Sequence, residues 1–242
     1  LSLRQALVPV AALLFGVAFL YAGHGLQTTL VPLRAEVEGF GDLEVGFLGT
    51  SFFAGFVLGC LFGPRVILSA GHIRAFAAMV SLGSAAAIAF PLLIEPAAWS
   101  LARFVIGFCL SGLYIIIESW LNEKSSNATR GVVMSTYTIL SLAMITVGQL
   151  VVTAYPLDSF ALFAIASIFL SLAAVPVALT RQSQPAPVAV VRFRPGRLWR
   201  IAPAAFAGAL LIGLANGAFW SLGPVFVTYR GLSTNDAAVF MS

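Results

Sequence analysis

An arginine inside an apolar segment is the residue that most constrains the chemistry of this sequence. Arg103 lies about 9 Å into a run that begins near Ala97, at a helical rise of about 1.5 Å per residue. A cation at the centre of a membrane helix costs at least about 2.5 kcal/mol, so it should face a protein interior. Two roles stay open: handling of a proton or an anion, or a lock on backbone carbonyls.

Small and polar residues share the helix face of Arg103. Gly107, Ser111 and Tyr114 follow it by four, eight and eleven positions. Such a stripe turns toward neighbouring helices in membrane bundles.

A second polar face lies in the first apolar run. His24, Gln27 and Thr28 stand at positions i, i+3 and i+4, which places three hydrogen-bonding groups on a predicted cavity face. An unperturbed histidine titrates near neutrality, so His24 could couple transport to protons. A satisfied structural histidine is the alternative.

The composition assigns these faces to membrane helices. Apolar residues make up 60% of the 242 residues and charged residues 9%, whereas soluble domains carry about 25% charged residues. A bilayer core needs about 20 apolar residues per helix. We expect an all-α transmembrane fold with spans at Ala6–Leu30, Leu43–Gly63, Ile73–Ile94, Ala97–Ile117, Gly131–Ala154, Phe160–Leu179 and Ile201–Val227.

Successive connections between the predicted spans are alternately rich and poor in Lys and Arg. One set, which includes the amino terminus, carries Arg4, Arg65, Arg74, Lys124, Arg130, Arg181, Arg192, Arg194, Arg197 and Arg200, and the opposite set carries Arg34 and Arg230. Because short cytoplasmic loops retain positive charge, we expect a cytoplasmic amino terminus in a multi-pass protein of the bacterial inner membrane.

One connection differs from the others in composition. Residues 181–200 are basic and include Pro185 and Pro187, which is typical of a linker. We therefore expect a six-helix bundle over 1–180, a cytoplasmic linker over 181–200 and the start of a second bundle over 201–242.

The seventh span resembles the first when the sequence is shifted by 192 positions. The shift aligns His24 with Asn216, Gly25 with Gly217, Thr29 with Ser221, Pro32 with Pro224 and Gly39 with Gly231. Two-bundle transporters show such repeats. Residues 233–236 are typical of the cap of an eighth helix, and we expect the parent protein to continue for about five more helices.

Three short motifs identify a family. Gly71 and Arg74 match part of a Gly-x-x-x-Asp-Arg-x-Gly-x-x-Arg loop, while Leu68 and Ser69 replace its Asp-Arg pair. Arg103 and Gly107 match an Arg-x-x-x-Gly helix pattern. The third motif is Glu118, Ser119, Trp120, Leu121 and Asn122 followed by Arg130 and Gly131, with Gly148, Gln149 and Leu150 further on.

These motifs resemble the major facilitator superfamily, and in particular its bacterial YcaD-like branch. The resemblance implies 3+3 inverted helices in the first bundle, and a secondary transporter that moves a small solute by alternating access, with proton coupling left open. The alternative is a non-transporting member that serves as an assembly factor or subunit of a larger membrane complex. We expect no enzyme, cofactor, metal or nucleic-acid partner; the expected partners are a small solute, protons if coupled, the lipid bilayer and, in the alternative, a membrane protein.

Two groups of residues follow from these arguments. The predicted solute contacts are His24, Gln27, Thr28, Arg103, Tyr114, Gln149, Asn216 and Trp220. The predicted gating residues are Arg65, Gly71, Arg74, Glu118, Glu123 and Arg130, in which the two acids pair with the arginines in one conformation and separate in another.

Overall fold

The structure, a computed structural model, describes residues 6–179 and 194–242, and every regular element within these ranges is helical. Arg4 and residues 181–193 of the predicted linker lie outside the described residues. The elements are η1 (Val8–Val10), α2 (Ala11–Val37), α3 (Asp42–Ala70), α4 (His72–Leu92), α5 (Pro96–Lys124), α6 (Arg130–Val151), η2 (Val152–Ala154), α7 (Phe160–Ala178), α8 (Pro195–Ile201), α9 (Pro203–Tyr229) and α10 (Thr234–Met241).

Seven of these helices, counted over the described ranges, are long and apolar enough to cross a membrane, which confirms the seven predicted spans. The first, second and fourth helices end at Val37, Ala70 and Lys124, each well beyond the predicted end. The first two helices continue through Pro32 and Pro64, which lie inside them.

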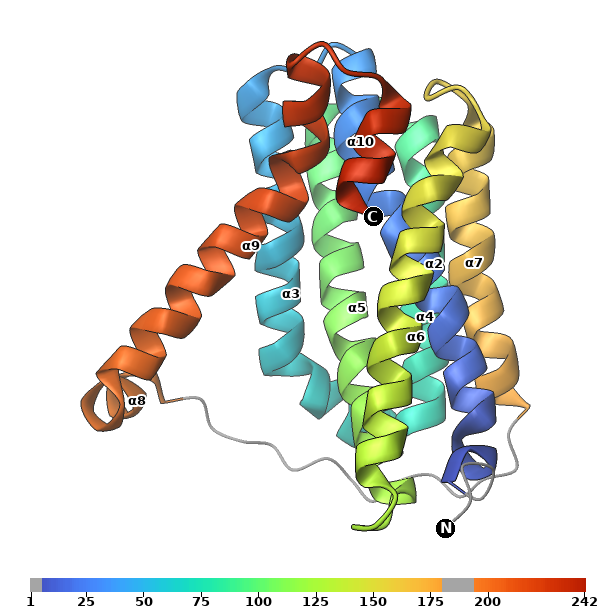
Figure 1. The fold of residues 1–242 in the computed structure, drawn as a ribbon, viewed down its shortest axis with the longest axis vertical. Helices are drawn as coiled ribbons and strands as arrows, with labels where there is room; N and C mark the ends of the chain where they lie inside the picture. The colour runs from blue at the N-terminus through green and yellow to red at the C-terminus, as the bar shows by residue number, and fades with distance from the viewer. Residues whose placement is uncertain (1–5, 180–193) are drawn as a thin grey trace.

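The helices α2 to α7 pack side by side (Figure 1). Helix α2 packs against α6 and α7, whereas α5 packs against α3 and α4, and α4 also packs against α7. Helices α2 and α5 approach each other over only a short stretch. Side chains therefore line the space between these two helices, whose backbones do not close it.

Glycines allow the closest helix contacts. A Cβ atom at Gly107 of α5 would overlap the carbonyl oxygen of Phe52 in α3, and one at Gly148 of α6 would overlap that of Ala22 in α2. Small residues of this kind are typical of membrane helix interfaces. These glycines allow α3 to pack closely on α5, and α6 to pack closely on α2. The two helix pairs lie on opposite sides of the space between α2 and α5.

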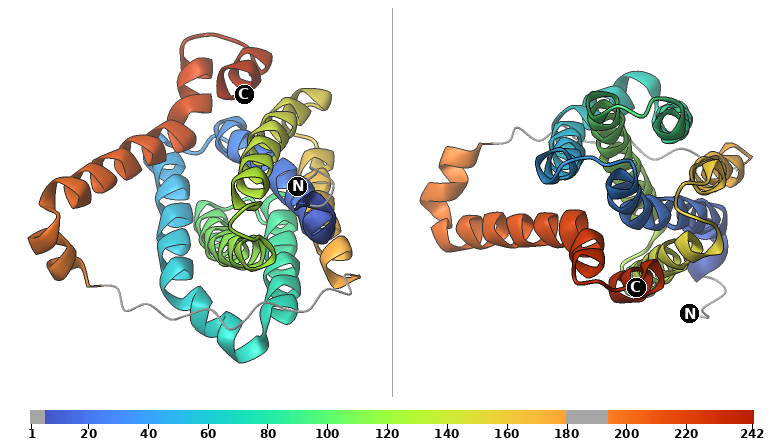
Figure 2. Two further views of the ribbon diagram at one scale, coloured as in Figure 1. Left: turned by 60° about the horizontal axis from the view of Figure 1, so that its bottom comes forward. Right: turned by 90° about the horizontal axis from the view of Figure 1, so that it is seen from above.

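Helix α9 touches the bundle with one end (Figures 1 and 2). Its segment Gly223–Val227 contains the buried residues of the helix, and Val227 packs with Leu33 of α2 and Ala237 of α10. The Thr228 hydroxyl donates a 2.7 Å hydrogen bond to Glu36 at the end of α2. The other end of α9, near α8, is largely exposed and stands away from the bundle.

The internal repeat extends to backbone conformation. Gly39 and Gly231, which are 192 positions apart, have φ angles of 79° and 78°. Each is followed by a helix whose third residue accepts from the N-cap backbone: the Gly41 N–H donates to Glu44 at the start of α3, and Ser233 and Asp236 form a full capping box at the start of α10. The predicted cap of an eighth helix is confirmed.

Candidate functional site

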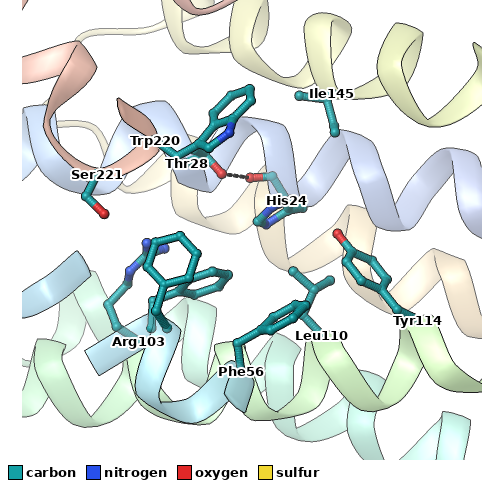
Figure 3. Close-up of a pocket in the computed structure, with 11 residues that line it drawn as sticks. His24, Thr28, Phe56, Arg103, Leu110, Tyr114, Ile145, Trp220 and Ser221 are labelled. Atoms are coloured by element: carbon teal, nitrogen blue, oxygen red, sulfur yellow. Dashed lines mark hydrogen bonds between the residues drawn. The ribbon is translucent and has the colours of Figure 1, made fainter. Parts of the chain in front are cut away.

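A cavity of about 230 Å³ lies between α2, α3, α5, α6 and α9 (Figure 3). Most of its lining is apolar or aromatic. The lining residues are His24, Thr28, Phe52, Phe53, Phe56, Arg103, Leu110, Tyr114, Ile145, Trp220 and Ser221.

Arg103 supplies the fixed charge of this cavity. Its side chain rises from α5 and only 5% of the residue is exposed. The guanidinium carbon lies 4.5 Å from the centre of the Phe52 ring, in the range of a cation–π contact. Its Nε and Nη1 atoms have no hydrogen-bond partner in the described part of the chain, so these atoms do not lock the helix through backbone carbonyls.

The Phe52 ring also contacts His24. The two rings are nearly parallel, with centroids 5.8 Å apart and an interplanar angle of 16°. Thr28, one turn further along α2, donates its hydroxyl proton to the His24 carbonyl at 2.9 Å. Phe52 thus joins the polar face of α2 to the arginine of α5.

Tyrosines close the side of the cavity near α6. The Tyr114 ring of α5 stacks on Tyr21 of α2, with centroids 5.2 Å apart. The Tyr21 hydroxyl forms a 2.7 Å hydrogen bond with the Tyr137 hydroxyl of α6. This arrangement fixes the ring of Tyr114 at the cavity wall.

Helix α9 covers the cavity with Trp220 and Ser221. The Ser221 side chain sits so close to Gly49 of α3 that a Cβ atom there would overlap its hydroxyl. Gly217 lies against the Phe53 ring. The seventh predicted span therefore packs on the second, and its Trp220 and Ser221 share the cavity with residues of the first and fourth.

Five of the eight predicted solute contacts line this cavity: His24, Thr28, Arg103, Tyr114 and Trp220. The other three do not. Gln27 lines a narrow gap of about 10 Å³ beside α4, α5 and α7, because successive helical residues turn by about 100° and Gln27 diverges from Thr28. Asn216 is exposed and donates to the Ile212 carbonyl of its own helix.

Gln149 is fully buried in α6 and its side-chain atoms have no hydrogen-bond partner among the described residues. It lies beside Gly148, where α6 meets α2, rather than at the cavity.

Sequence reasoning missed the apolar lining. Phe52, Phe53 and Phe56 occupy one region of α3 and all three face the cavity. Apolar residues carry no signal inside a membrane helix, where most positions are apolar. The close spacing of three phenylalanines was the one feature that could have drawn attention to them.

The predicted gating residues lie at the other end of the helices, away from the α2–α9 contact. Gly71, with a φ angle of 82°, forms the turn between α3 and α4. Arg65 donates to the Leu61 carbonyl of its own helix and lies over Phe62. The remaining members Arg74, Glu118, Glu123 and Arg130 are exposed.

A larger groove of about 1100 Å³ runs between α3 and α9. Asp42 at its edge is its single charged lining residue, and none of the predicted solute contacts lines it. The smaller cavity is therefore the better candidate site.

Comparison with known proteins gives homologues over nearly the whole chain. The uncharacterized MFS-type transporter Ent638_1421 of Enterobacter sp. (strain 638) is 24% identical over 97% of this chain. The uncharacterized MFS-type transporters YcaD of Escherichia fergusonii and of Escherichia coli O139:H28 are 22% and 23% identical over the same share. The chain spans 62% of the length of each of these relatives. No family model matches it.

These homologues confirm the resemblance to the YcaD-like branch of the major facilitator superfamily. The all-α fold with its seven apolar helices agrees with that relationship. The chain is a multi-pass membrane protein.

Proposed function

We propose that this chain, a homologue of YcaD-like transporters, is part of a secondary transporter that moves a small solute across the membrane through the cavity between α2, α5 and α9. The observation that carries the proposal is this cavity, which combines a buried charge with an aromatic lining between two copies of an internal repeat. Transporters of this kind bind their solutes between such repeats.

The position of α9 supports an alternating-access mechanism. Contacts near Thr228 close one end of the space between α2 and α9, while the opposite end of α9 is separated from the bundle. Rocking of the segment 201–242 against the bundle 1–180 would open the closed end and close the open one. These two segments are the proposed domains, joined by the linker 181–200.

The loop charges support a location in the bacterial inner membrane with a cytoplasmic amino terminus. In that orientation the closed end faces outward. The gating residues then lie on the cytoplasmic side, where Glu118 and Glu123 would pair with Arg65, Arg74 or Arg130 once α9 closes on the bundle. His24, which lines the cavity, is the residue proposed to couple solute movement to protons.

Uptake by proteoliposomes tests this function. Full-length protein is reconstituted and offered a panel of radiolabelled sugars, amino acids, organic acids and amines. We expect uptake of at least one solute, and loss of that uptake in Thr28→Trp, which fills the cavity. Thr153→Trp, at an exposed position after α6, is the matched control and should transport normally.

Absence of uptake across the whole panel, with protein that is folded by its melting curve, would contradict transport. That result would favour the non-transporting alternative, in which the chain acts as an assembly factor or subunit of a membrane complex. Equal uptake by wild type and Thr28→Trp would place the route outside this cavity.

A further inference from the structure

Among the residues that the structure describes, none supplies a counter-charge to Arg103 in the cavity. The residue is 5% exposed, and its Nε and Nη1 atoms have no partner within the described ranges. A guanidinium stays protonated in proteins, and an isolated buried cation is costly unless it is paired. The cation–π contact with Phe52 offsets part of that cost and leaves these hydrogen-bond donors unused.

Within residues 6–179 and 194–242, no acidic side chain lines this cavity. Glu38 pairs with Arg34 at the end of α2, and Glu118 is exposed at the far end of α5. A ligand that enters the cavity therefore meets one positive charge that no described acid compensates, on a guanidinium whose buried Nε and Nη1 donors are unpartnered. A carboxylate matches such a group best, because the two oxygens of a carboxylate accept hydrogen bonds from the planar guanidinium.

The rest of the lining selects for an apolar ring. Phe52, Phe53, Phe56, Tyr114 and Trp220 bring five aromatic rings to one small space. An apolar cavity of about 150 Å³ holds a benzene molecule, so about 230 Å³ has room for a benzene ring with a carboxylate.

We propose that the cavity binds a small aromatic monocarboxylate, with the carboxylate on the Arg103 guanidinium and the ring among Phe52, Phe56 and Trp220. One negative charge balances the single fixed positive charge, whereas an inorganic phosphate dianion would leave an uncompensated charge in an apolar space. The claim that this ligand is the transported solute rests on the proposed function. The claim that the ligand binds in this cavity does not.

Calorimetric titration of the full-length protein in detergent tests the ligand class without any variant. The probes are sodium benzoate, benzamide, sodium acetate and inorganic phosphate. Benzamide has the same ring and nearly the same shape as benzoate but no charge, and acetate has the charge but no ring. We expect benzoate to bind at least about tenfold more tightly than each of the others, since charge-assisted hydrogen bonds and ring burial both contribute.

Variants of Arg103 then test whether its charge binds the carboxylate. Arg103→Gln should weaken benzoate binding by about 10- to 100-fold and should remove the preference over benzamide. Arg103→Lys keeps the charge and loses the planar fork, so it should bind benzoate more weakly than wild type but still prefer it to benzamide. Arg197→Gln, at an exposed arginine of α8, is the matched control and should bind like wild type.

Benzoate binding that is no tighter than benzamide binding in wild type would overturn the proposal, even if Arg103→Gln did not fold. Benzoate binding that is unchanged in a folded Arg103→Gln variant would overturn it as well. The two proposals fail separately. Benzoate that binds but is not taken up by proteoliposomes contradicts transport of this ligand alone, whereas uptake of another solute with no benzoate binding contradicts the ligand class and leaves transport standing.

Discussion

Where buried polar side chains in the described bundle are hydrogen-bonded, the usual partner is a carbonyl of their own helix, as for Thr28 and Ser141, or a side chain of another helix. Tyr21 bonds to Tyr137, and the Ser84 hydroxyl bonds to that of Ser167 at 2.6 Å. Burial of an unpaired hydroxyl costs free energy because the hydrogen bonds to water are lost, so such pairs are the rule in protein interiors. Gln27, Thr29 and Gln149 have a buried side-chain atom without a partner in the described chain, as Arg103 does, but Arg103 is the charged member of this group and it lines the cavity.

Removal of one hydroxyl from the Tyr21–Tyr137 pair should destabilise the protein. Tyr137→Phe leaves the Tyr21 hydroxyl buried without its 2.7 Å partner, and we expect a loss of about 1–3 kcal/mol, seen as a lower melting midpoint in detergent. Tyr155→Phe, at an exposed tyrosine, should leave the midpoint unchanged. Equal midpoints for the two variants would show that this bond contributes nothing to stability.

At the scale of helices, glycine positions decide which pairs come into close contact. Gly55 and Gly107 bring α3 and α5 together, and Gly25 and Gly148 do the same for α2 and α6. Apolar attraction alone does not hold helices together in lipid, so packing and hydrogen bonds must do so. The close pairs are therefore sensitive to a single added side chain.

A side chain at Gly148 should separate α6 from α2. Gly148→Val places atoms where the Ala22 carbonyl and the backbone of Leu26 lie, and overpacking of this kind costs about 1–3 kcal/mol. We expect a lower melting midpoint and less protein in the membrane fraction. Gly213→Val, at a glycine of α9 with nothing within 4 Å, is the matched control. The packing model fails if both variants melt like wild type.

The helices themselves could be predicted because each is an apolar block of bilayer length. Their ends could not. Arg34 and Glu36 suggested that the first span had ended, yet both lie in the last turns of α2, where each reaches a partner across the bundle. Arg34 donates to the Leu157 carbonyl and Glu36 accepts from Thr228. Hydropathy reports which residues favour lipid, and these tertiary contacts lie outside what it measures.

Part of the cavity could also be predicted. Arg103 stood out because charge is costly in a membrane, and the repeat drew attention to the segment of α9 that contributes Trp220. The predicted polar face of α2 included one residue that does not line the cavity, because Gln27 and Thr28 turn toward different neighbouring helices. Sequence spacing gives angles around one helix, but the direction of its neighbours comes from packing.

At the scale of the whole molecule, α9 contacts the bundle by one end. The contact between Glu36 and Thr228 closes that end, and the chain offers Ser84 and Ser167 as a comparable contact inside the bundle. A contact between rocking parts must break during transport, whereas a contact within one rigid part need not.

Cross-linking should separate these two kinds of contact. After replacement of Cys60 and Cys109 by serine, the pair Glu36→Cys with Thr228→Cys is joined by a short thiol reagent. We expect uptake of the transported solute to stop and to return on reduction of a cleavable linker. Ser84→Cys with Ser167→Cys, joined in the same way between α4 and α7, should keep its uptake. Full uptake by the joined Glu36–Thr228 pair would rule out opening at this end.

The orientation of the molecule gives a further prediction. Connections rich in Lys and Arg should stay in the cytoplasm, so the segment between α5 and α6 should be inside and the segment between η2 and α7 outside. Alkaline phosphatase fused after Leu157 should be active, and the same reporter fused after Ser126 should be inactive. The opposite pattern would reverse the assigned orientation.

Glu36 and Thr228 are 192 positions apart, so in the predicted repeat each occupies the other's place in its own copy. A two-fold axis that related the copies would pass through a contact between such equivalent positions. In a symmetric homodimer, the two residues on such an axis are identical, and two glutamates there would repel each other. A carboxylate can face a hydroxyl donor at this point only when the two copies differ in sequence. Tandem fusion of the copies in one gene allows that divergence, which two identical subunits could never reach.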